Sequence, residues 1–310
     1  KRFLITGSNG QVGRGLASVL NQQYGKQNIL LTDITSTSQN QDNHYEPLDV
    51  TDLQKFTNIV KSNKITHIIH MAGILSASCE KNLPLGMKVN IDGMHNALNI
   101  ARDTNSSIFI PSTIATMGPN LEKKPVPDDV LQEPITFYGI SKVYMEKLGT
   151  YYNKKFGLDF RCLRYPAIIS AYEYNAGGTA SYPTELINAI VKNKPYSIYL
   201  DSNITLPFMY ISDCIKGTIK LIEADNTRLN RRVYNFNGLS FSPEEFLKEL
   251  KMVFKNIDVD YKIEKLRNEI AKTWPVALDD KFARNDWDWK PEIDSTKKLV
   301  ETLIKDVQKN

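Results

Sequence analysis

Three glycines lie where a short apolar segment meets a helical pattern, and this junction constrains the fold more than any other feature of the sequence. Residues 2–6 read RFLIT, and apolar side chains recur at helical spacing from residue 10 to about residue 24. Gly7 permits a tight turn, Gly10 lets the backbone approach a pyrophosphate, and Gly13 allows the helix to pack closely on the strand. The helix N-terminus then offers free N–H groups to the anion. The pattern predicts a dinucleotide-binding turn, the alternative being a flexible loop, and we expect contacts from Gly7, Asn9, Gly10, Gln11, Val12 and Gly13.

Strand-like and helix-like segments alternate through the first half of the chain. The apolar runs comprise residues 28–33, 66–72, 107–111 and 159–165, and the helical patterns comprise residues 52–62, 88–103 and 138–156. This alternation predicts βαβ units and a mostly parallel sheet. We therefore expect an α/β fold: a Rossmann-like doubly wound parallel sheet with a smaller α/β substrate lobe at the C-terminal side.

The strand-like and helix-like segments become shorter and less regular after Pro166. We predict a dinucleotide-binding domain at residues 1–166. Residues 167–310 would form mainly a substrate-binding lobe, with some segments returning to the core. Within that half, Ser242 is an expected helix cap, Pro243 suits the first helical position, and Glu245 completes a capping box.

Composition excludes several classes of protein. The 310 residues include 39 Lys and Arg against 35 Asp and Glu, a net charge of +4, and the two signs are interspersed. We therefore expect no nucleic-acid partner, and no apolar run is long enough to cross a bilayer. The three cysteines are far apart and the four histidines form no cluster, so we expect neither a disulfide framework nor a metal site. A reducing compartment fits this usage: the cytoplasm, or the mitochondrial matrix if a leader was removed and the source is eukaryotic.

Asp33 ends the second predicted strand, about 20 residues after the glycines, where an acid meets the ribose hydroxyls of a dinucleotide. A carboxylate there repels a 2′-phosphate, and neither neighbour in the sequence is Lys or Arg. The position therefore predicts NAD rather than NADP. Asp49 and Val50 follow a short third strand and are candidates for the adenine edge, although a turn aspartate is an equal interpretation.

Tyr138 and Lys142 are four residues apart and so share one face of a predicted helix. A free tyrosine titrates near pH 10. A lysine ammonium beside it, with the positive ring of an oxidised nicotinamide, would lower that pKa. Tyr138 would then remove a hydroxyl proton while a hydride leaves the same carbon. The alternative is an ordinary exposed Tyr–Lys pair.

Ser112 and Thr113 end a predicted strand about one crossover upstream of that helix. The carboxyl ends of parallel strands line the ligand crevice, so a hydroxyl there would orient the substrate oxygen beside Tyr138. Thr113 is the preferred candidate, and Ser112 stays open as the other.

Together these motifs resemble the extended short-chain dehydrogenase/reductase superfamily. The resemblance is carried by the three glycines, Asp33, Asp49-Val50, His70-Met71-Ala72-Gly73, Asn90, Ser112-Thr113 and Tyr138-x3-Lys142. Further segments are similar to the short-chain-type L-threonine 3-dehydrogenases, namely residues 73–77, 80–82, 111–115, 164–170, 177–182, 207–211, 274–275 and 286–287. The resemblance covers essentially the whole chain.

The resemblance implies roles for residues that local patterns do not assign. Cofactor contacts are expected from Met71, Ala72, Gly73, Asn90, Tyr138, Lys142, Tyr165 and Ile168. Substrate contacts are expected from Ser76, Ser112, Thr113, Tyr138, Gly178 and Thr179, where the glycines at 177 and 178 suit a mobile cover. The sequence departs from the family pattern at Ala167 and, in the cover, at Ala180 and Ser181.

The implied activity is the oxidation of L-threonine to 2-amino-3-oxobutanoate with reduction of NAD⁺, by a homodimer. The alternative is a UDP-sugar epimerase or related sugar-nucleotide enzyme, which would use the same tyrosine and NAD. Arg231 and Arg232 keep that alternative open, since some such enzymes use an arginine near a comparable strand. A non-enzymatic NAD-binding regulator is a third hypothesis, which the intact Tyr138/Lys142 pair disfavours.

Overall fold

The computed structural model describes residues 1–38, 44–122, 124–171 and 178–308. Its large sheet contains β1 (Phe3–Thr6), β2 (Ile29–Asp33), β3 (His44–Pro47), β4 (His67–His70), β5 (Ser107–Phe109), β6 (Ser112–Thr113), β7 (Phe160–Tyr165) and β11 (Val233–Asn235). The helices around it are α1 (Gln11–Tyr24), α2 (Leu53–Ser62), α3 (Ser76–Lys81), α4 (Leu83–Met87), α5 (Met94–Asp103), α6 (Phe137–Phe156), α8 (Ile211–Glu223) and α11 (Lys281–Trp287).

The large sheet is parallel, in the order β11-β7-β5-β4-β1-β2-β3, with β6 pairing to β7. β1 lies between β2 and β4, so the strand order reverses there. In open α/β sheets ligands bind outside the carboxyl ends of the strands at such a point. The glycine turn that follows β1 therefore lies at the edge where a cofactor is expected.

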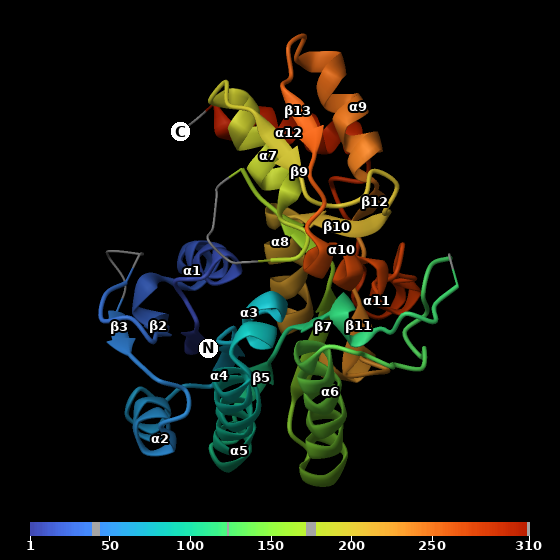
Figure 1. The fold of residues 1–310 in the computed structure, drawn as a ribbon. Helices are drawn as coiled ribbons and strands as arrows, with labels where there is room; N and C mark the ends of the chain where they lie inside the picture. Colours follow the sequence, from blue (N-terminus) through green and yellow to red (C-terminus); the bar gives the residue numbers. More distant parts are fainter. Residues whose placement is uncertain (39–43, 123, 172–177, 309–310) are drawn as a thin grey trace.

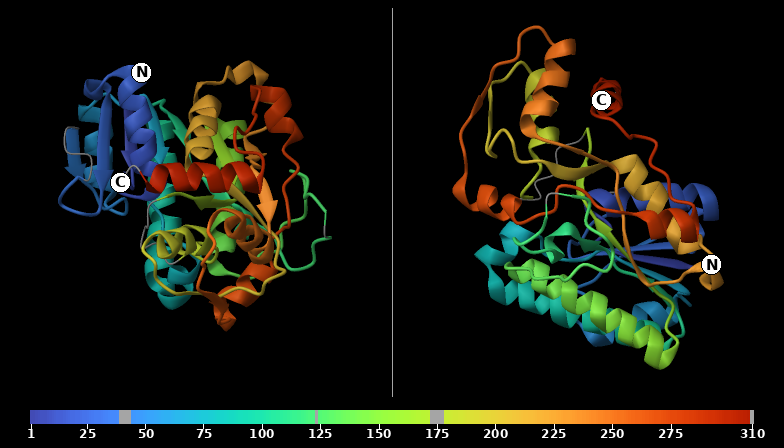
Figure 2. Two further views of the ribbon diagram at one scale, coloured as in Figure 1. Left: turned by 90° about the horizontal axis from the view of Figure 1, so that it is seen from above. Right: turned by 90° about the vertical axis from the view of Figure 1, so that its right-hand side faces the viewer.

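Apolar side chains cover both faces of this sheet. On one face, α2, α5 and α6 contribute to a core that includes Phe56, Ala97 and Met145. On the other face, α1, α8 and α11 pack around Leu20 and Trp287. Figure 1 shows α2, α5 and α6 below the sheet and α1 and α8 above it, and the right-hand view of Figure 2 shows the same layers from the side. Doubly wound sheets have this arrangement, so the expected fold class is confirmed.

A smaller lobe lies over the carboxyl edge of the sheet, in the upper part of Figure 1. Its strands are β8 (Ala167–Ile169), β10 (Leu206–Tyr210) and β12 (Leu239–Phe241) in one sheet, and β9 (Tyr196–Ile198) and β13 (Val259–Tyr261) in another. Its helices are α7 (Tyr182–Val191), α9 (Pro243–Val253), α10 (Lys265–Lys272) and α12 (Thr296–Val307). The expected capping box of α9 is present, with the Ser242 and Glu245 side chains each bonded to the other residue's backbone N–H.

Segments from the second half return to the large sheet. β11 pairs with β7, and α8 and α11 pack on the same face as α1. The sequence patterns did not predict two features. Helices α3 and α4 precede the predicted helix at residues 88–103, and that helix begins with a π-helical turn, η2 (Lys88–Gly93). Short 3-10 turns are η1 (Lys26–Asn28), η3 (Ile114–Thr116) and η4 (Asn226–Arg228). No helix within the described ranges is both long and apolar enough to span a bilayer.

Candidate active site

The glycine turn after β1 is packed too tightly for side chains. Gly7 has φ +64°, and a Cβ atom there would lie 2.7 Å from the backbone nitrogen of Ala72. A Cβ atom at Gly13 would lie 2.5 Å from the Gly7 carbonyl oxygen. A Cβ atom at Gly10 would approach the same oxygen to 3.3 Å. The turn therefore requires glycine at its first and third positions for backbone packing, as the sequence predicts.

Asp33 holds this turn from the neighbouring strand. Its Oδ2 accepts a hydrogen bond from the Asn9 backbone N–H at 3.0 Å, and its Oδ1 accepts from Ile34 N–H at 2.8 Å. Arg14, which the sequence analysis overlooked, donates from Nε to the Asn9 carbonyl at 2.9 Å. A carboxylate so placed lies beside the loop that would hold the nucleotide, at the position where ribose hydroxyls are bound in this fold.

A cavity of about 580 Å³ joins the glycine turn to the predicted catalytic residues. Its size and its glycine-lined end fit a nicotinamide dinucleotide, because only glycine leaves the backbone N–H groups this accessible. Of the predicted cofactor residues, those lining it are Gly7, Asn9, Gly10, Gln11, Val12, Gly13, Met71, Gly73, Tyr138, Lys142, Tyr165 and Ile168. Of the predicted substrate residues, those lining it are Ser76, Ser112, Thr113, Tyr138, Gly178 and Thr179.

Five predicted cofactor residues do not line this cavity, and their roles stay predictions: Asp33, described above, and Asp49, Val50, Ala72 and Asn90. The Asp49 carboxylate accepts from the backbone N–H and hydroxyl of Thr51. Val50 is buried beneath Gly93. The Asn90 side chain bonds both backbone groups of Ile74, at 2.8 and 2.9 Å, and so fixes the loop after β4. The backbone of Ala72 abuts Gly7.

Tyr138 and Lys142 lie in the first turns of α6, which begins after the Thr136 cap. The Lys142 Nζ donates to the Pro111 carbonyl at 2.7 Å and lies 5.8 Å from the centre of the Tyr138 ring. Burial lowers the pKa of Lys142 to about 8. Burial also raises the pKa of the Tyr138 phenol, the Cys79 thiol adds to that rise, and a hydrogen bond with Thr113 opposes it.

In the protein without cofactor Lys142 does not lower the pKa of Tyr138, and the lowering expected from Lys142 together with a bound oxidised nicotinamide stays a prediction. The lysine ammonium is directed to a carbonyl group rather than to the phenol, and desolvation of the phenolate is the larger effect. Any net lowering of that pKa has to come from a bound positive charge.

Ser112 and Thr113 have different partners. The Ser112 hydroxyl donates to the buried carboxylate of Glu146. The Thr113 hydroxyl accepts from the Ala115 backbone N–H at 3.2 Å, and Thr113 lines the cavity together with Tyr138. This geometry favours Thr113 as the hydroxyl that orients a substrate oxygen.

The segment that begins at Gly178 lines the cavity from the smaller lobe. Thr179 and Ser76 are buried, and their hydroxyl oxygens lie 3.3 Å apart, which links the smaller lobe to the large one. Trp274 also lines the cavity, although no sequence motif assigns it a role. The predicted glycine at 177 lies outside the described residues.

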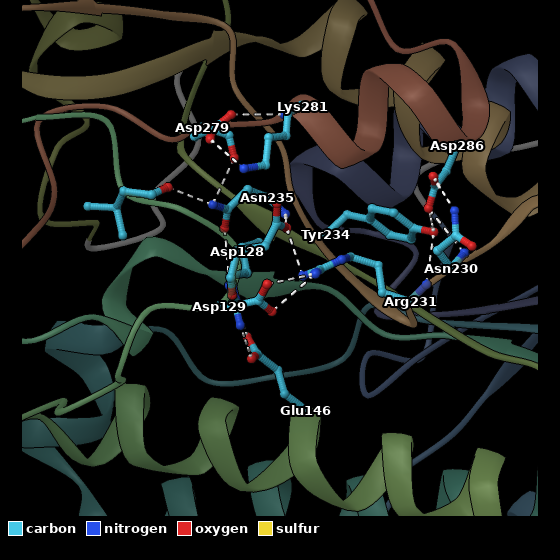
Figure 3. Close-up of polar contacts among 12 residues, drawn as sticks. Asp128, Asp129, Glu146, Asn230, Arg231, Tyr234, Asn235, Asp279, Lys281 and Asp286 are labelled. Carbon is cyan, nitrogen blue, oxygen red and sulfur yellow. Dashed lines mark hydrogen bonds and ion pairs between the residues drawn. The ribbon is translucent and has the colours of Figure 1, made fainter.

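Arg231 and Arg232 do not line the cavity. Arg231 donates from Nη2 to both Asp129 oxygens at 3.0 Å, and its Nη1 lies 3.6 Å from Asp128 (Figure 3). Arg232 Nη1 lies 3.5 Å from Asp159. Arg231 and Arg232, which kept the sugar-nucleotide alternative open, therefore form ion pairs outside the cavity. Within the described part of the chain, no cluster of three or more His, Cys, Asp or Glu could hold a metal.

This fold and this cavity define a class: an NAD-dependent oxidoreductase of the extended short-chain dehydrogenase type, with a Tyr–Lys pair at the carboxyl edge of the sheet. A family described as "NAD dependent epimerase/dehydratase family" matches residues 3–236. The chain belongs to this family.

Individual relatives agree with the resemblance drawn from the motifs. The mitochondrial L-threonine 3-dehydrogenase of Bos taurus is 40% identical over 98% of this chain and 82% of its own length. The crystal structure of L-threonine dehydrogenase from Phytophthora infestans is 38% identical, with a TM-score of 0.95 over 100% of both chains. The holo form of the GalE-like L-threonine dehydrogenase from Cupriavidus necator is 34% identical, with a TM-score of 0.95 over 98% of this chain and 99% of that one.

Proposed function

We propose that this protein oxidises the β-hydroxyl of L-threonine to give 2-amino-3-oxobutanoate while NAD⁺ is reduced to NADH. The observation that carries the proposal is the match to L-threonine 3-dehydrogenases along essentially the whole chain. The cavity supports it, because hydroxyl side chains of Ser76, Thr113 and Thr179 line it together with Tyr138. The reaction would begin threonine catabolism to glycine.

The glycine turn would hold the pyrophosphate of the cofactor, and Asp33 its ribose hydroxyls. Tyr165 and Ile168 line the cavity and would lie near the nicotinamide. Bound NAD⁺ supplies a hydride acceptor and a positive charge near the phenol. We infer a preference for NAD over NADP, because a 2′-phosphate would meet the Asp33 carboxylate.

Tyr138 would act as the general base. Its phenolate oxygen would take the proton from the threonine hydroxyl, giving the neutral phenol, as the hydride leaves the same carbon. Thr113 fixes the phenol and the substrate oxygen relative to each other. Lys142, held by the Pro111 carbonyl, would place an ammonium group within reach of the cofactor ribose.

Ser76 and Thr179 would hold the polar groups of threonine from opposite sides of the cavity. The segment from Gly178 would cover the bound amino acid and exclude water. Ser181, a departure from the family pattern, donates to the Gly178 carbonyl at 3.1 Å and lies 3.3 Å from the Tyr199 hydroxyl. Its hydroxyl therefore stabilises the cover itself.

The experiment that tests the proposal measures NADH formation by the purified protein with several substrates in parallel. Threonine, serine, 3-hydroxybutyrate and UDP-sugars are compared at equal concentration. Threonine is expected to give the highest kcat/KM. Conversion of a UDP-sugar without net NADH, together with no response to threonine, would contradict the proposal.

We further propose that the protein is a homodimer formed through α4 and α6. These helices pack against each other and present apolar side chains that are at least 41% exposed: Leu83, Leu85, Met87, Ile140, Tyr144 and Tyr151. A two-fold axis would bring the same patch of a second copy against them. Sedimentation of the wild type and of Ile140→Asp tests this, with a dimer expected for the first and a monomer for the second.

A reducing compartment suits the protein, since the free thiols of Cys79, Cys162 and Cys214 are all buried. We propose the cytoplasm, or the mitochondrial matrix if the source is eukaryotic. A thiol-reactive probe applied to the unfolded protein isolated from its source would be expected to label all three.

A further inference from the structure

A buried carboxylate lies one helical turn beyond Lys142 and outside the proposed reaction. Glu146 is on the inner face of α6 and is only 2% exposed. An ionised carboxylate is unfavourable inside a protein unless it is paired and fully hydrogen-bonded. The partners of Glu146 therefore indicate what the group does.

Arg164 of β7 fixes the Glu146 carboxylate at two points. Its Nε donates to Oε1 at 3.0 Å and its Nη2 donates to Oε2 at 2.8 Å. Gln132 adds a bond to Oε2 at 2.9 Å. The Nη1 of Arg164 binds the Asp128 carbonyl at 2.7 Å and Asn235 Oδ1 at 3.2 Å, and Figure 3 shows Glu146 on the α6 side of this network. A two-point ion pair of this kind holds the carboxylate in one orientation.

The remaining partner of Glu146 is Ser112, which lies at the active site. Oε1 accepts the hydroxyl of Ser112, which lies in β6 directly before Thr113. Successive side chains of a strand point to opposite faces, so the Ser112 hydroxyl is bonded to Glu146 while Thr113 lines the cavity together with Tyr138. β6 has only two residues, paired with Arg164 and Tyr165 of β7. Few backbone bonds hold so short a strand, and a side-chain anchor becomes important.

We propose that Glu146 is a positioning residue: held by Arg164, its carboxylate anchors Ser112 and thereby fixes the neighbouring Thr113 hydroxyl against the Tyr138 phenol. The inference rests on the proposed function in assigning the base to Tyr138. It explains why a charged residue occupies a buried position of α6 that an apolar side chain would fill more simply. It also explains why Ser112, although at the cavity, directs its proton away from it.

The charge of Glu146 acts on Lys142 as well. The carboxylate raises the pKa of Lys142 and opposes the lowering caused by burial. The other titratable groups facing this ammonium are the Tyr138 phenol, Cys162 of β7, Cys79 of α3 and His70 of β4. The phenol and both thiols are neutral where Lys142 titrates because burial raises their pKa values, and His70 is neutral because burial lowers its pKa to about 3.

A matched pair of variants tests the anchor. Ser112→Ala removes the link to β6 and leaves the Glu146–Arg164 pair complete. Gln132→Ala removes a hydrogen bond from the other oxygen of the same carboxylate. Ser112→Ala is expected to lower kcat for threonine by about 10- to 100-fold, because displacements near 1 Å have effects of that size. The KM for threonine and the Kd for NADH should stay unchanged, and Gln132→Ala should keep the kcat of the wild type.

Two further measurements separate positioning from other roles. The crystal structure of Ser112→Ala is expected to show the Thr113 hydroxyl displaced from Tyr138, a readout that does not depend on turnover. Glu146→Gln keeps an acceptor for Ser112 but loses the charge, so the alkaline limb of its kcat–pH profile should move to lower pH as Lys142 loses its proton more easily.

The inference is overturned if Ser112→Ala leaves Thr113 in place with normal kcat, if it raises the KM for threonine instead, or if both variants of the pair reduce kcat equally. An inactive wild type would contradict the proposed function alone, since the displacement of Thr113 would still be measurable.

Discussion

Gly139→Ala places one methyl group between α6, which carries Tyr138, and the turn after Thr113. The Cβ atom would lie 2.1 Å from the Ala115 carbonyl oxygen and 2.7 Å from Pro134 Cβ. Close C···O contacts in proteins are about 3.3–3.6 Å, so α6 and the turn after Thr113 must separate by about 1.2 Å. Because Tyr138 precedes this residue, its phenol moves away from Thr113 by a comparable distance. A displacement of about 1 Å corresponds to about a 100-fold loss of rate, and we expect kcat for threonine to fall by that factor.

The assay measures steady-state NADH formation, with NADH binding followed separately by fluorescence. Gly157→Ala is the matched control. It ends the same helix with φ +71° and has nothing within 4 Å of the new Cβ, so it should lower stability by about 1–2 kcal/mol through backbone strain and leave kcat unchanged. Normal turnover in Gly139→Ala, or an equal loss in both variants, would refute the reasoning.

Three other predictions follow from the site and its surroundings. Tyr138→Phe should lower kcat by about 10²- to 10⁴-fold while NADH fluorescence titration shows unchanged binding; near-normal turnover would exclude the phenol as base. The kcat/KM for NAD⁺ should exceed that for NADP⁺, and Asp33→Ser should narrow the difference; equal values in the wild type would remove Asp33 from the ribose. Burial lowers the pKa of His70 to about 3, so between pH 6.5 and that value only the unfolded chain binds this proton. The free energy of unfolding should therefore fall by about 1.4 kcal/mol per pH unit on acidification, and thermal denaturation of His70→Asn should lack that contribution.

The structural features that the sequence predicts are those defined by local spacing. The glycines of the first turn are set by backbone contacts within a few residues, and the Ser242 capping box closes within one helical turn. The spacing of Tyr138 and Lys142 places them on the same helix, and the strand order brings that helix to the glycine turn. Local rules of this kind act before any tertiary contact forms.

The parts that the sequence did not predict depend on residues far apart in the chain. Trp274 reaches the cavity from a segment more than 130 residues after Tyr138. The choice between Ser112 and Thr113 depends on Glu146 and Arg164, which lie on other elements. The direction of the Tyr138 pKa shift follows from burial, which hydrophobic periodicity does not reveal. The π-helical turn at residues 88–93 has no distinctive periodicity either.

The most direct test of the account follows deuterium from L-threonine labelled at carbon 3. The purified protein is incubated with this substrate and NAD⁺, and the reduced cofactor is analysed by mass spectrometry. Oxidation at the β-carbon predicts that the NADH formed carries one deuterium, in an amount equal to the 2-amino-3-oxobutanoate produced. Absence of labelled NADH, in a preparation that interconverts a UDP-sugar without net cofactor reduction, would contradict the account.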